Sequence, residues 1–369
     1  MIRIGVVGLG KMGLSHLAMI NAHPDASVVA VVDSTSYILD VLGKYTGLRT
    51  FGDYAAMLDG VELDAVLIAT PTRFHGPMVR TALERGLHVF CEKPLCLSSS
   101  ESRELAALAE ERGVVTQVGY HNRFVGTFGE VRRLLDLGAI GRVTHLQAEA
   151  YGPVVLRSKG STWRSQRTEG GGALYDYAAH PIDLLTWYAG AARGVGGTVL
   201  GSVFSADTED EVSSTVFFDG LTAQVSVNWS DESFRKMTTR ITATGTAGRI
   251  QADRQELQVF LRSTAPEIDG YETGWNLRNT TELTDSVWFY LRGEEYSAQL
   301  DHFVRRAHDR SVAPVNDFAS ASLTDEVIEM MITDAAAGPS VLAAAVSGSA
   351  QGPASQPTPT RRRLLRRRA

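Results

Sequence analysis

The stretch IRIGVVGLGKMG, residues 2–13, decides the fold of the first part of this chain. Its apolar first half predicts a strand, and three glycines with the spacing G-x-G-x-x-G follow at Gly8, Gly10 and Gly13. Gly8 permits a tight turn, Gly10 lets a pyrophosphate group approach the backbone, and Gly13 lets the next helix pack closely on the strand. The free N–H groups at the start of that helix favour phosphate. The stretch therefore predicts a dinucleotide site.

An acidic residue stands where such a site binds ribose. Asp33 ends the second predicted strand, 20 residues after Gly13. A carboxylate there accepts hydrogen bonds from a ribose 2′-hydroxyl and repels a 2′-phosphate, so the sequence favours NAD over NADP. The alternative role of Asp33 is to cap the following helix. Lys11, Met12 and Ser34 flank these positions and complete this part of the predicted cofactor site.

Short apolar strands alternate with helices as far as about residue 120. Strands that are apolar throughout indicate a parallel sheet buried on both faces, and repeated β-α units predict a doubly wound α/β fold. A serine-rich start and Gly113 just past the end mark the helix of residues 99–112. The predicted strands are residues 2–7, 27–33, 64–70, 87–92 and 114–120.

The pattern changes in the second half, where strands alternate apolar and polar residues. Period-two alternation predicts an antiparallel sheet with one less-buried face. A helical stretch at 174–190 interrupts these strands, and helices at 296–309 and 323–336 follow them. The predicted strands are residues 142–151, 198–205, 211–218, 222–230 and 239–245. We therefore expect a dinucleotide-binding domain over 1–122 and an α+β substrate-binding and oligomerisation domain over 123–338.

Composition excludes several classes of protein. The 369 residues are 44% hydrophobic, which is enough for a large core, but no run approaches the roughly 20 apolar residues of a membrane-spanning helix. Six arginines lie within 361–368, and without them the net charge of −6 becomes −12, which disfavours nucleic acid as a partner. Residues 339–369 are predicted to be a disordered, arginine-rich tail. Cys91 and Cys96 form neither a disulfide framework nor a zinc site, and we expect a cytoplasmic protein.

A short motif, CEKPL, ends the fifth predicted strand. Ligands of open parallel sheets bind beyond the carboxyl ends of the strands, so Glu92 and Lys93 should reach the cleft. Pro94 would fix the turn, through a cis bond or otherwise. A buried lysine can exchange a proton or hold a substrate hydroxyl. The alternative is a solvated lysine that follows a strand.

The segment GGGALYDYAAHPID, residues 170–183, holds the second candidate for proton chemistry. Asp176 and His180 are four residues apart, so a helix would project both from one face, and Asp183 adds a polar group one turn on. A histidine beside a carboxylate suits general acid/base catalysis between an alcohol and a ketone. The alternative is a buried histidine with its hydrogen bonds satisfied. The spacing offers no third or fourth metal ligand, so no metal is expected.

With ATPTRFH (Ala69–His75) and QVGYHNRF (Gln117–Phe124), these motifs resemble the Gfo/Idh/MocA oxidoreductases over residues 1–338. The resemblance implies a Rossmann domain followed by a domain with a large open antiparallel sheet, which commonly forms homodimers or homotetramers. Ala178 replaces the glycine that is usual in the family's D-x-G-x-H pattern. The implied sites are Lys93, Asp176 and His180 for catalysis, Thr70, Pro71 and His75 beside the nicotinamide half of the cofactor, and His121, Asn122 and Asp183 for the sugar.

The expected reaction is reversible hydride transfer between a nicotinamide and a secondary alcohol carbon of a sugar or cyclitol. Either His180 or Lys93 would accept the hydroxyl proton, and the sequence leaves this choice open. The loop before the catalytic segment is basic and could bind a phosphate, carboxylate or nucleotide diphosphate on the sugar, with Arg164 as the substrate contact. It could equally be solvated or contact another subunit. Its basic residues are Arg157, Lys159, Arg164 and Arg167, and Trp163 lies among them.

Two other functions stay open at this level. A dehydrogenase similar to the dihydrodiol dehydrogenases or biliverdin reductases would use the same motifs on a different substrate. A regulator that binds NAD without turnover would keep the glycine loop and Asp33 but would not need Lys93, Asp176 and His180.

Overall fold

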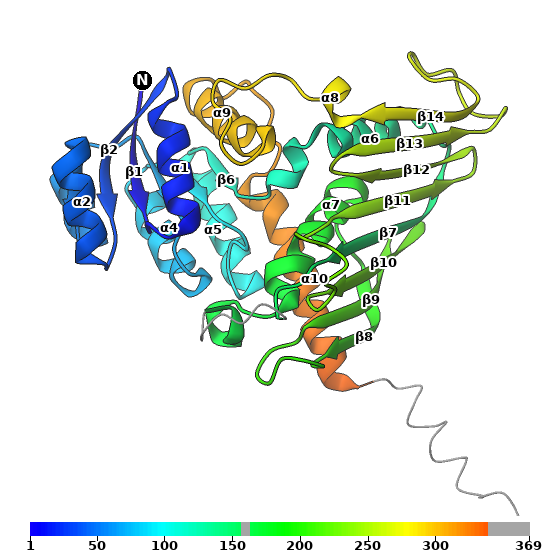
Figure 1. The fold of residues 1–369 in the computed structure, drawn as a ribbon, viewed down its shortest axis with the longest axis horizontal. Coiled ribbons are helices and arrows are strands. Elements are labelled where there is room, and N and C mark those ends of the chain that lie inside the picture. Colours follow the sequence, from blue (N-terminus) through cyan, green and yellow to red (C-terminus); the bar gives the residue numbers. More distant parts are fainter. Residues whose placement is uncertain (156–162, 339–369) are drawn as a thin grey trace, which may run out of the picture.

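The computed structural model describes residues 1–155 and 163–338, which form two sheets with helices around and between them (Figure 1). The first sheet has six parallel strands in the order β3-β2-β1-β4-β5-β6. Its strands are β1 (Ile2–Val7), β2 (Ala26–Val32), β3 (Arg49–Phe51), β4 (Ala65–Ile68), β5 (His88–Cys91) and β6 (Thr116–Val118).

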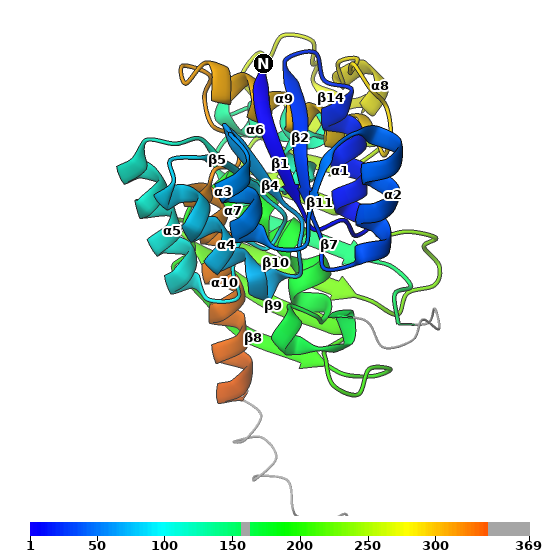
Figure 2. The same ribbon diagram turned by 90° about the vertical axis from the view of Figure 1, so that its left-hand side faces the viewer.

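Helices cover this sheet on both sides, as Figure 2 shows with the sheet toward the viewer. They are α1 (Lys11–Asn21), α2 (Ser36–Thr46), α3 (Tyr54–Gly60), α4 (His75–Glu84) and α5 (Ser99–Arg112). All four residues of β4 are buried, as expected for a strand covered on both faces. Gly113 ends α5 in the left-handed conformation with φ +60°, at the predicted position. The doubly wound prediction is confirmed.

The second sheet has eight strands in the order β14-β13-β12-β11-β7-β10-β9-β8. All neighbouring pairs are antiparallel except β7 and β10, which run parallel in the centre. The large, mostly antiparallel sheet is therefore confirmed, with a mixed pairing that strand patterns alone do not reveal. Its strands are β7 (Val143–Tyr151), β8 (Gly194–Gly201), β9 (Glu211–Phe218), β10 (Leu221–Asn228), β11 (Arg240–Gly245), β12 (Gly248–Asp253), β13 (Glu256–Leu261) and β14 (Gly274–Asn279).

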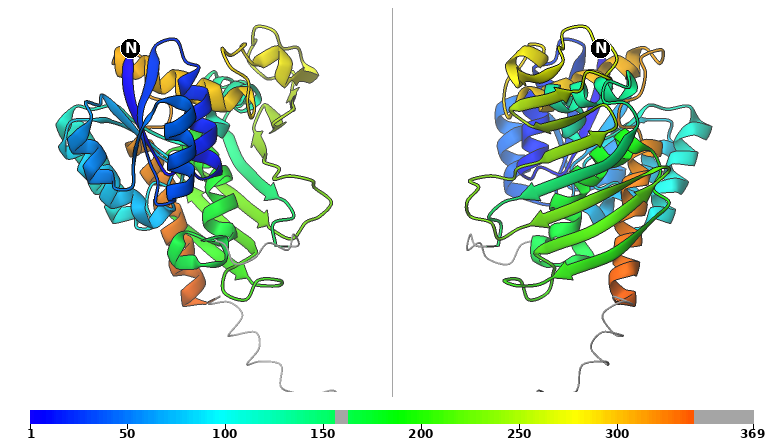
Figure 3. Two further views of the ribbon diagram at one scale, coloured as in Figure 1. Left: turned by 60° about the vertical axis from the view of Figure 1, so that its left-hand side comes forward. Right: turned by 90° about the vertical axis from the view of Figure 1, so that its right-hand side faces the viewer.

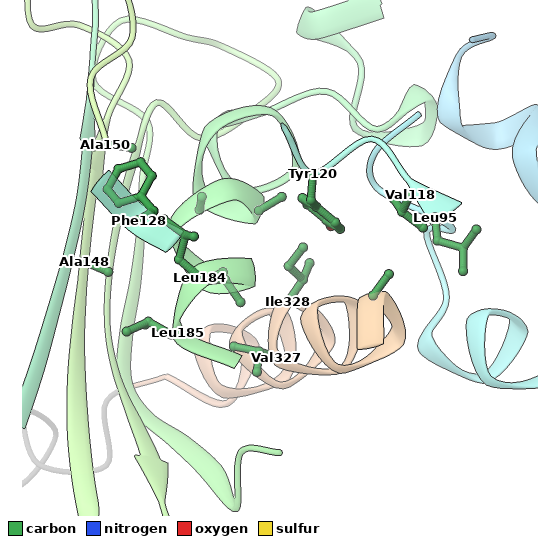
Figure 4. Close-up of a cluster of buried hydrophobic side chains, with 14 of the residues drawn as sticks. Leu95, Val118, Tyr120, Phe128, Ala148, Ala150, Leu184, Leu185, Val327 and Ile328 are labelled. Atoms are coloured by element: carbon green, nitrogen blue, oxygen red, sulfur yellow. The ribbon is translucent and has the colours of Figure 1, made fainter. Parts of the chain in front are cut away.

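Helices lie against one face of the second sheet, and the right-hand view of Figure 3 looks onto its other face. Figure 4 shows the core on the covered side, where Phe128, Leu184 and Leu185 lie beside Ala148 and Ala150 of β7. The helical elements of this half are the short 3-10 turn η2 (His121–Phe124), α6 (Gly126–Asp136), 3-10 turns at Trp163–Ser165 and Arg167–Glu169, a π-helical turn η5 (Leu174–Ala178), α7 (Ala179–Ala189), α8 (Thr280–Leu283), α9 (Glu294–His308) and α10 (Phe318–Ala337).

The last two helices join the halves of the chain. Leu300, Phe303 and Val304 of α9 pack in one apolar cluster with Ile4 and Val6 of β1, so α9 covers part of the first sheet. Helix α10 packs on both α5 and α7 and lies between the two sheets in Figure 1. The division at residue 122 remains a prediction, because residues after it complete the core of the first sheet.

Some of the predicted features lie outside the described residues. These are Arg157 and Lys159 of the basic loop and the tail over 339–369. Within the described ranges, no helix is long and apolar enough to cross a membrane. The same ranges contain no group of three or more His, Cys, Asp or Glu side chains arranged to hold a metal ion.

Candidate active site

A cavity of about 2250 Å³ opens beyond the carboxyl ends of the first sheet and continues along the second-sheet half. Ligands of doubly wound folds bind at this edge of the sheet. Most of the predicted site residues line it, although they come from segments far apart in sequence. The predicted residues in its lining are Gly8, Gly10, Lys11, Met12, Asp33, Ser34, Thr70, Pro71, Glu92, Lys93, His121, Arg164, Asp176 and His180.

The three glycines have the backbone geometry that their predicted roles require, and Gly13 does not line the cavity. Gly8 has φ +86°, and a Cβ there would stand 2.7 Å from the carbonyl oxygen of Ala69. At Gly13, a Cβ would stand 1.7 Å from the carbonyl oxygen of Gly8, so only glycine lets α1 sit this close. A Cβ at Gly10 would meet nothing within 4 Å, which leaves open space beside the backbone where a pyrophosphate would approach.

Asp33 lines the cavity, as its predicted role in ribose binding requires, and it is not the N-cap of α2, which is Thr35. One carboxylate oxygen, Oδ2, accepts the N–H of Leu9 in the glycine loop at 2.6 Å, and Oδ1 accepts the N–H of Thr35 at 2.8 Å. The carboxylate thus fixes the loop and the start of α2 while it lines the cavity. Each oxygen has a second lone pair for a ligand hydroxyl.

Lys93 and Asp176 meet in the cavity across the two halves of the chain. The ammonium Nζ of Lys93 donates to the backbone carbonyl of Asp176 at 2.7 Å and to its Oδ1 at 3.2 Å. Arg164 donates from Nε to the other oxygen, Oδ2, at 2.9 Å. Burial alone would raise the pKa of Asp176, but the charges of Lys93 and Arg164 outweigh it and lower that pKa. The site therefore holds an ionised carboxylate between two cations.

His180 lies beside this pair but is not hydrogen-bonded to Asp176 in the described structure, so the carboxylate acts on Lys93 and Arg164 instead. His180 is 4% exposed, and within the described residues its Nδ1 has no hydrogen-bond partner. The alternative of a buried, satisfied histidine is thus not what the structure contains. Burial first, then the charges of Lys93 and Arg254, lower the pKa of His180 well below its usual value. The imidazole is neutral at neutral pH and able to accept a proton.

His121 forms the neighbouring wall. Its ring stands edge-on to His180, with centroids 4.9 Å apart, and stacks on Tyr296 at 4.4 Å. Burial, then repulsion from a protonated His180 and from Arg254, lower the pKa of His121 well below its usual value as well. Two neutral imidazoles, arranged edge to face, therefore line the cavity together with Lys93 and Asp176.

Three further residues of this wall are not marked by any motif in the sequence. Arg254 follows β12, and Glu295 and Tyr296 begin α9. Arg254 donates to the Glu295 carboxylate, and its guanidinium lies 3.5 Å from Nε2 of His121. These residues belong to no motif, because distant segments meet only in the folded chain.

Three predicted residues lie behind the cavity lining. Asp183 is fully buried and accepts two hydrogen bonds from Arg123, at 2.9 and 2.6 Å. Asn122 is buried beside Thr239, at 3.5 Å. His75 lies between the carbonyl oxygens of Thr70 and Pro94, each 2.9 Å away. These side chains support the site from behind, and their contact with a ligand stays a prediction.

The turn at Pro94 is fully described, whereas the basic loop is described only in part. The Lys93–Pro94 peptide bond is cis. Arg167 pairs with Glu209 at 2.6 Å, and of the two loop arginines within the described residues, Arg164 lines the cavity and Arg167 does not.

Comparison with known proteins identifies both halves of the chain. Residues 2–120 match the family model described as "Oxidoreductase family, NAD-binding Rossmann fold", and residues 128–251 match the "GFO/IDH/MocA C-terminal domain". The two matches occur in the order that the sequence motifs predict.

Relatives act on sugars and cyclitols. The scyllo-inositol 2-dehydrogenase (NAD(+)) of Bacillus subtilis is 31% identical over 192 residues, which are 52% of this chain and 54% of that protein. The dTDP-3,4-didehydro-2,6-dideoxy-α-D-glucose 3-reductase of Streptomyces antibioticus is 31% identical over 257 residues, 69% of this chain and 76% of the reductase. Among solved structures, GenD2 from gentamicin A biosynthesis, in complex with NAD, is 27% identical with a TM-score of 0.73, covering 91% of this chain and 95% of GenD2. For several curated relatives, the match spans about half of their length.

Proposed function

The chain belongs to the Gfo/Idh/MocA family of oxidoreductases, and on that premise we propose that it is an NAD-dependent dehydrogenase of a sugar or cyclitol. The reaction would interconvert a secondary alcohol and a ketone. The observation that carries the proposal is the meeting of Lys93, Asp176 and His180 in the cavity that the glycine loop and Asp33 also line. A protein that only binds a dinucleotide does not need this trio.

The residues present fit a dinucleotide. Gly10 leaves the backbone open for a pyrophosphate, and Asp33 offers acceptors to a ribose diol, which favours NAD over NADP. Thr70, Pro71 and Glu92 line the cavity between this loop and Lys93, where the nicotinamide half would lie. A bound nicotinamide would accept a hydride from the alcohol carbon or return it to the ketone.

The protein's own groups divide the proton chemistry between them. His180 is neutral, so we assign it as the acceptor of the hydroxyl proton. Lys93 uses two of its three N–H donors on Asp176, so the third can hold the substrate oxygen. Asp176 keeps the ammonium in place and balances its charge. The buried surroundings strengthen these interactions relative to water.

Two forms of substrate are consistent with the cavity. Neutral polyols need only the hydroxyl-binding groups described above. Arg164 favours an anionic sugar, because its guanidinium carries a positive charge, lines the cavity and is 43% exposed. A homodimer or homotetramer formed through the open sheet is also part of the proposal.

The test is a screen for turnover by absorbance of reduced nicotinamide. NAD and NADP are each offered with neutral polyols, sugar phosphates, uronic acids and nucleotide sugars. We expect turnover with NAD, lost by at least about 10²-fold in Lys93→Ala and retained in Lys44→Ala, whose lysine is exposed on α2. Equal activity in Lys93→Ala would overturn the assignment.

The other outcomes separate the open alternatives. Turnover of neutral polyols alone removes the anionic form of the proposal. Activity confined to dihydrodiols or to biliverdin replaces the substrate class. Tight NAD binding without turnover of any substrate favours the regulator.

A further inference from the structure

A buried histidine on the cofactor helix is bonded to the segment that carries Lys93. His16 lies one turn into α1, is fully buried, and its Nε2 is 2.6 Å from Oε1 of Glu92. The edge of its ring packs on Phe90 of β5, with centroids 5.2 Å apart. Neither the glycine motif nor the EKP motif includes this histidine, and it does not line the cavity.

The second oxygen of Glu92 is also fixed. Oε2 accepts the backbone N–H of Lys93 at 3.2 Å. It also lies only 2.9 Å from the place where a Cβ at position 119 would stand, and Gly119 leaves that space free. The carboxylate is therefore held by His16 on one side and by the backbone of Lys93 on the other.

The charge on Glu92 bears on the position of Lys93. Burial alone would raise the pKa of Glu92, but the hydrogen bond from His16 and the charges of His16 and Lys93 outweigh it and lower that pKa. An ionised carboxylate beside Lys93 competes with Asp176 for the ammonium. The hydrogen bond from His16 directs the Glu92 charge toward α1 and leaves Nζ of Lys93 with Asp176.

We propose that His16 is a positioning residue, which acts through Glu92 to keep Lys93 aligned with Asp176. The inference rests on the proposed dehydrogenase function. It adds that one side-chain contact, between His16 and Glu92, fixes the position of Lys93 relative to helix α1, which follows the glycine loop. Small displacements of such a group lower rates strongly, by up to about 10²-fold for roughly 1 Å.

The test compares His16→Leu with His16→Gln and with a matched control. Glutamine retains an N–H donor that can reach Glu92, whereas leucine has none. His23→Leu is the control, because His23 is also buried, lies just past the end of α1 and bonds to a different carboxylate, Asp301, at 3.3 Å. We expect kcat to fall about 10- to 100-fold in His16→Leu and to recover most of that loss in His16→Gln. NAD affinity should stay within about threefold of wild type in each variant.

A double-mutant cycle separates positioning from general loss of structure. In a Glu92→Gln background, His16→Leu should not lower kcat further, because the Glu92 charge through which His16 acts on Lys93 has already been removed. Equal losses of kcat in His16→Leu and His23→Leu, or independent effects of His16→Leu and Glu92→Gln, would overturn the inference.

A third measurement needs no turnover. The chain has five lysines, so acetylation of Lys93 is readily followed by mass spectrometry. In His16→Leu, the freed Glu92 carboxylate should hold the Lys93 ammonium and slow its acetylation about threefold, the effect of half a pKa unit. An unchanged or faster rate contradicts the positioning role. If Lys93 is acetylated more slowly in His16→Leu than in wild type, and the wild-type protein turns over no substrate, the positioning role stands and the proposed function alone is rejected.

Discussion

Asp176 and Asp183 are seven residues apart on one helical segment, yet their surroundings differ in the property that matters for chemistry. Asp176 lies in the cavity with Lys93 and the half-exposed Arg164. Asp183 is sealed against Arg123, whose side chain is 1% exposed and also donates to Ser320 and to the carbonyl of Val315. The Lys93–Asp176 pair leaves one N–H of Lys93 for a ligand. The hydrogen bonds of the Arg123–Asp183 pair instead join η2, α7 and α10 to one another. Residue type alone therefore does not separate a charge pair proposed for catalysis from one that joins elements of the fold.

The largest expected effect tests the sealed pair. Asp183→Asn leaves the Arg123 guanidinium buried without a counter-charge, so the free energy of unfolding should fall by about 3–5 kcal/mol. Urea denaturation measures this change. The matched control is Asp219→Asn, which breaks an exposed pair with Arg193 and should change the value by less than about 1 kcal/mol. A similar small change at Asp183 would show that the sealed pair contributes little.

The next effect concerns a carboxyl group close to the sealed pair. Burial raises the pKa of Asp325 to about 7, against a value of 3.8 for a free side chain. Between these values the folded protein retains a proton that the unfolded chain releases, so this group lowers stability as pH rises toward 7. Asp325→Asn removes the effect while its amide oxygen can still accept from Ser102.

We therefore expect the stability of Asp325→Asn relative to wild type to increase by about 2–3 kcal/mol from pH 5 to pH 8. Urea denaturation at both pH values measures the change. The exposed Asp269→Asn serves as control and should show no such trend. A relative stability that is constant with pH would place the ionised form of Asp325 in the folded protein throughout.

The smallest expected effect in free energy is at the cavity. Asp176→Asn should lower kcat about 10- to 100-fold, equivalent to about 1.4–2.7 kcal/mol, because the ammonium of Lys93 loses its counter-charge. The free energy of unfolding should fall by less than in Asp183→Asn, since Lys93 and Arg164 line the cavity and Arg164 is 43% exposed, whereas Arg123 is 1% exposed. A loss of stability as large as that of Asp183→Asn would erase the distinction between the two pairs.

Much of the cavity could be predicted because its chemistry lies in short motifs. The glycine loop, Asp33, Lys93, Asp176 and His180 each sit at a strand end or helix start that the sequence marks. The π-helical turn at Leu174–Ala178 could not be predicted. Its hydrogen bonds run from i to i+5, so helical spacing does not give the relative direction of Asp176 and Asp183.

Other features depend on tertiary contacts that no local pattern records. His16 sits on the buried side of α1, and only the fold brings Glu92 to it. Arg254 and Tyr296 reach the cavity from elements more than 40 residues apart. Strands β12, β13 and β14 were not predicted from the sequence, nor was the parallel pairing of β7 with β10. Register and neighbour choice are settled by the packing of whole elements rather than by one strand's sequence.

The packing of α9 on the first sheet means that this sheet is synthesised well before the helix that completes its core. The strands of that sheet leave the ribosome within the first 118 residues, but Leu300, Phe303 and Val304, which complete one of its apolar clusters, emerge almost two hundred residues later. During that interval the nascent domain exposes an apolar surface with no partner of its own. Such surfaces are where chaperones bind and where aggregation starts. The yield of active protein in a cell should therefore depend on how well this surface is protected during translation.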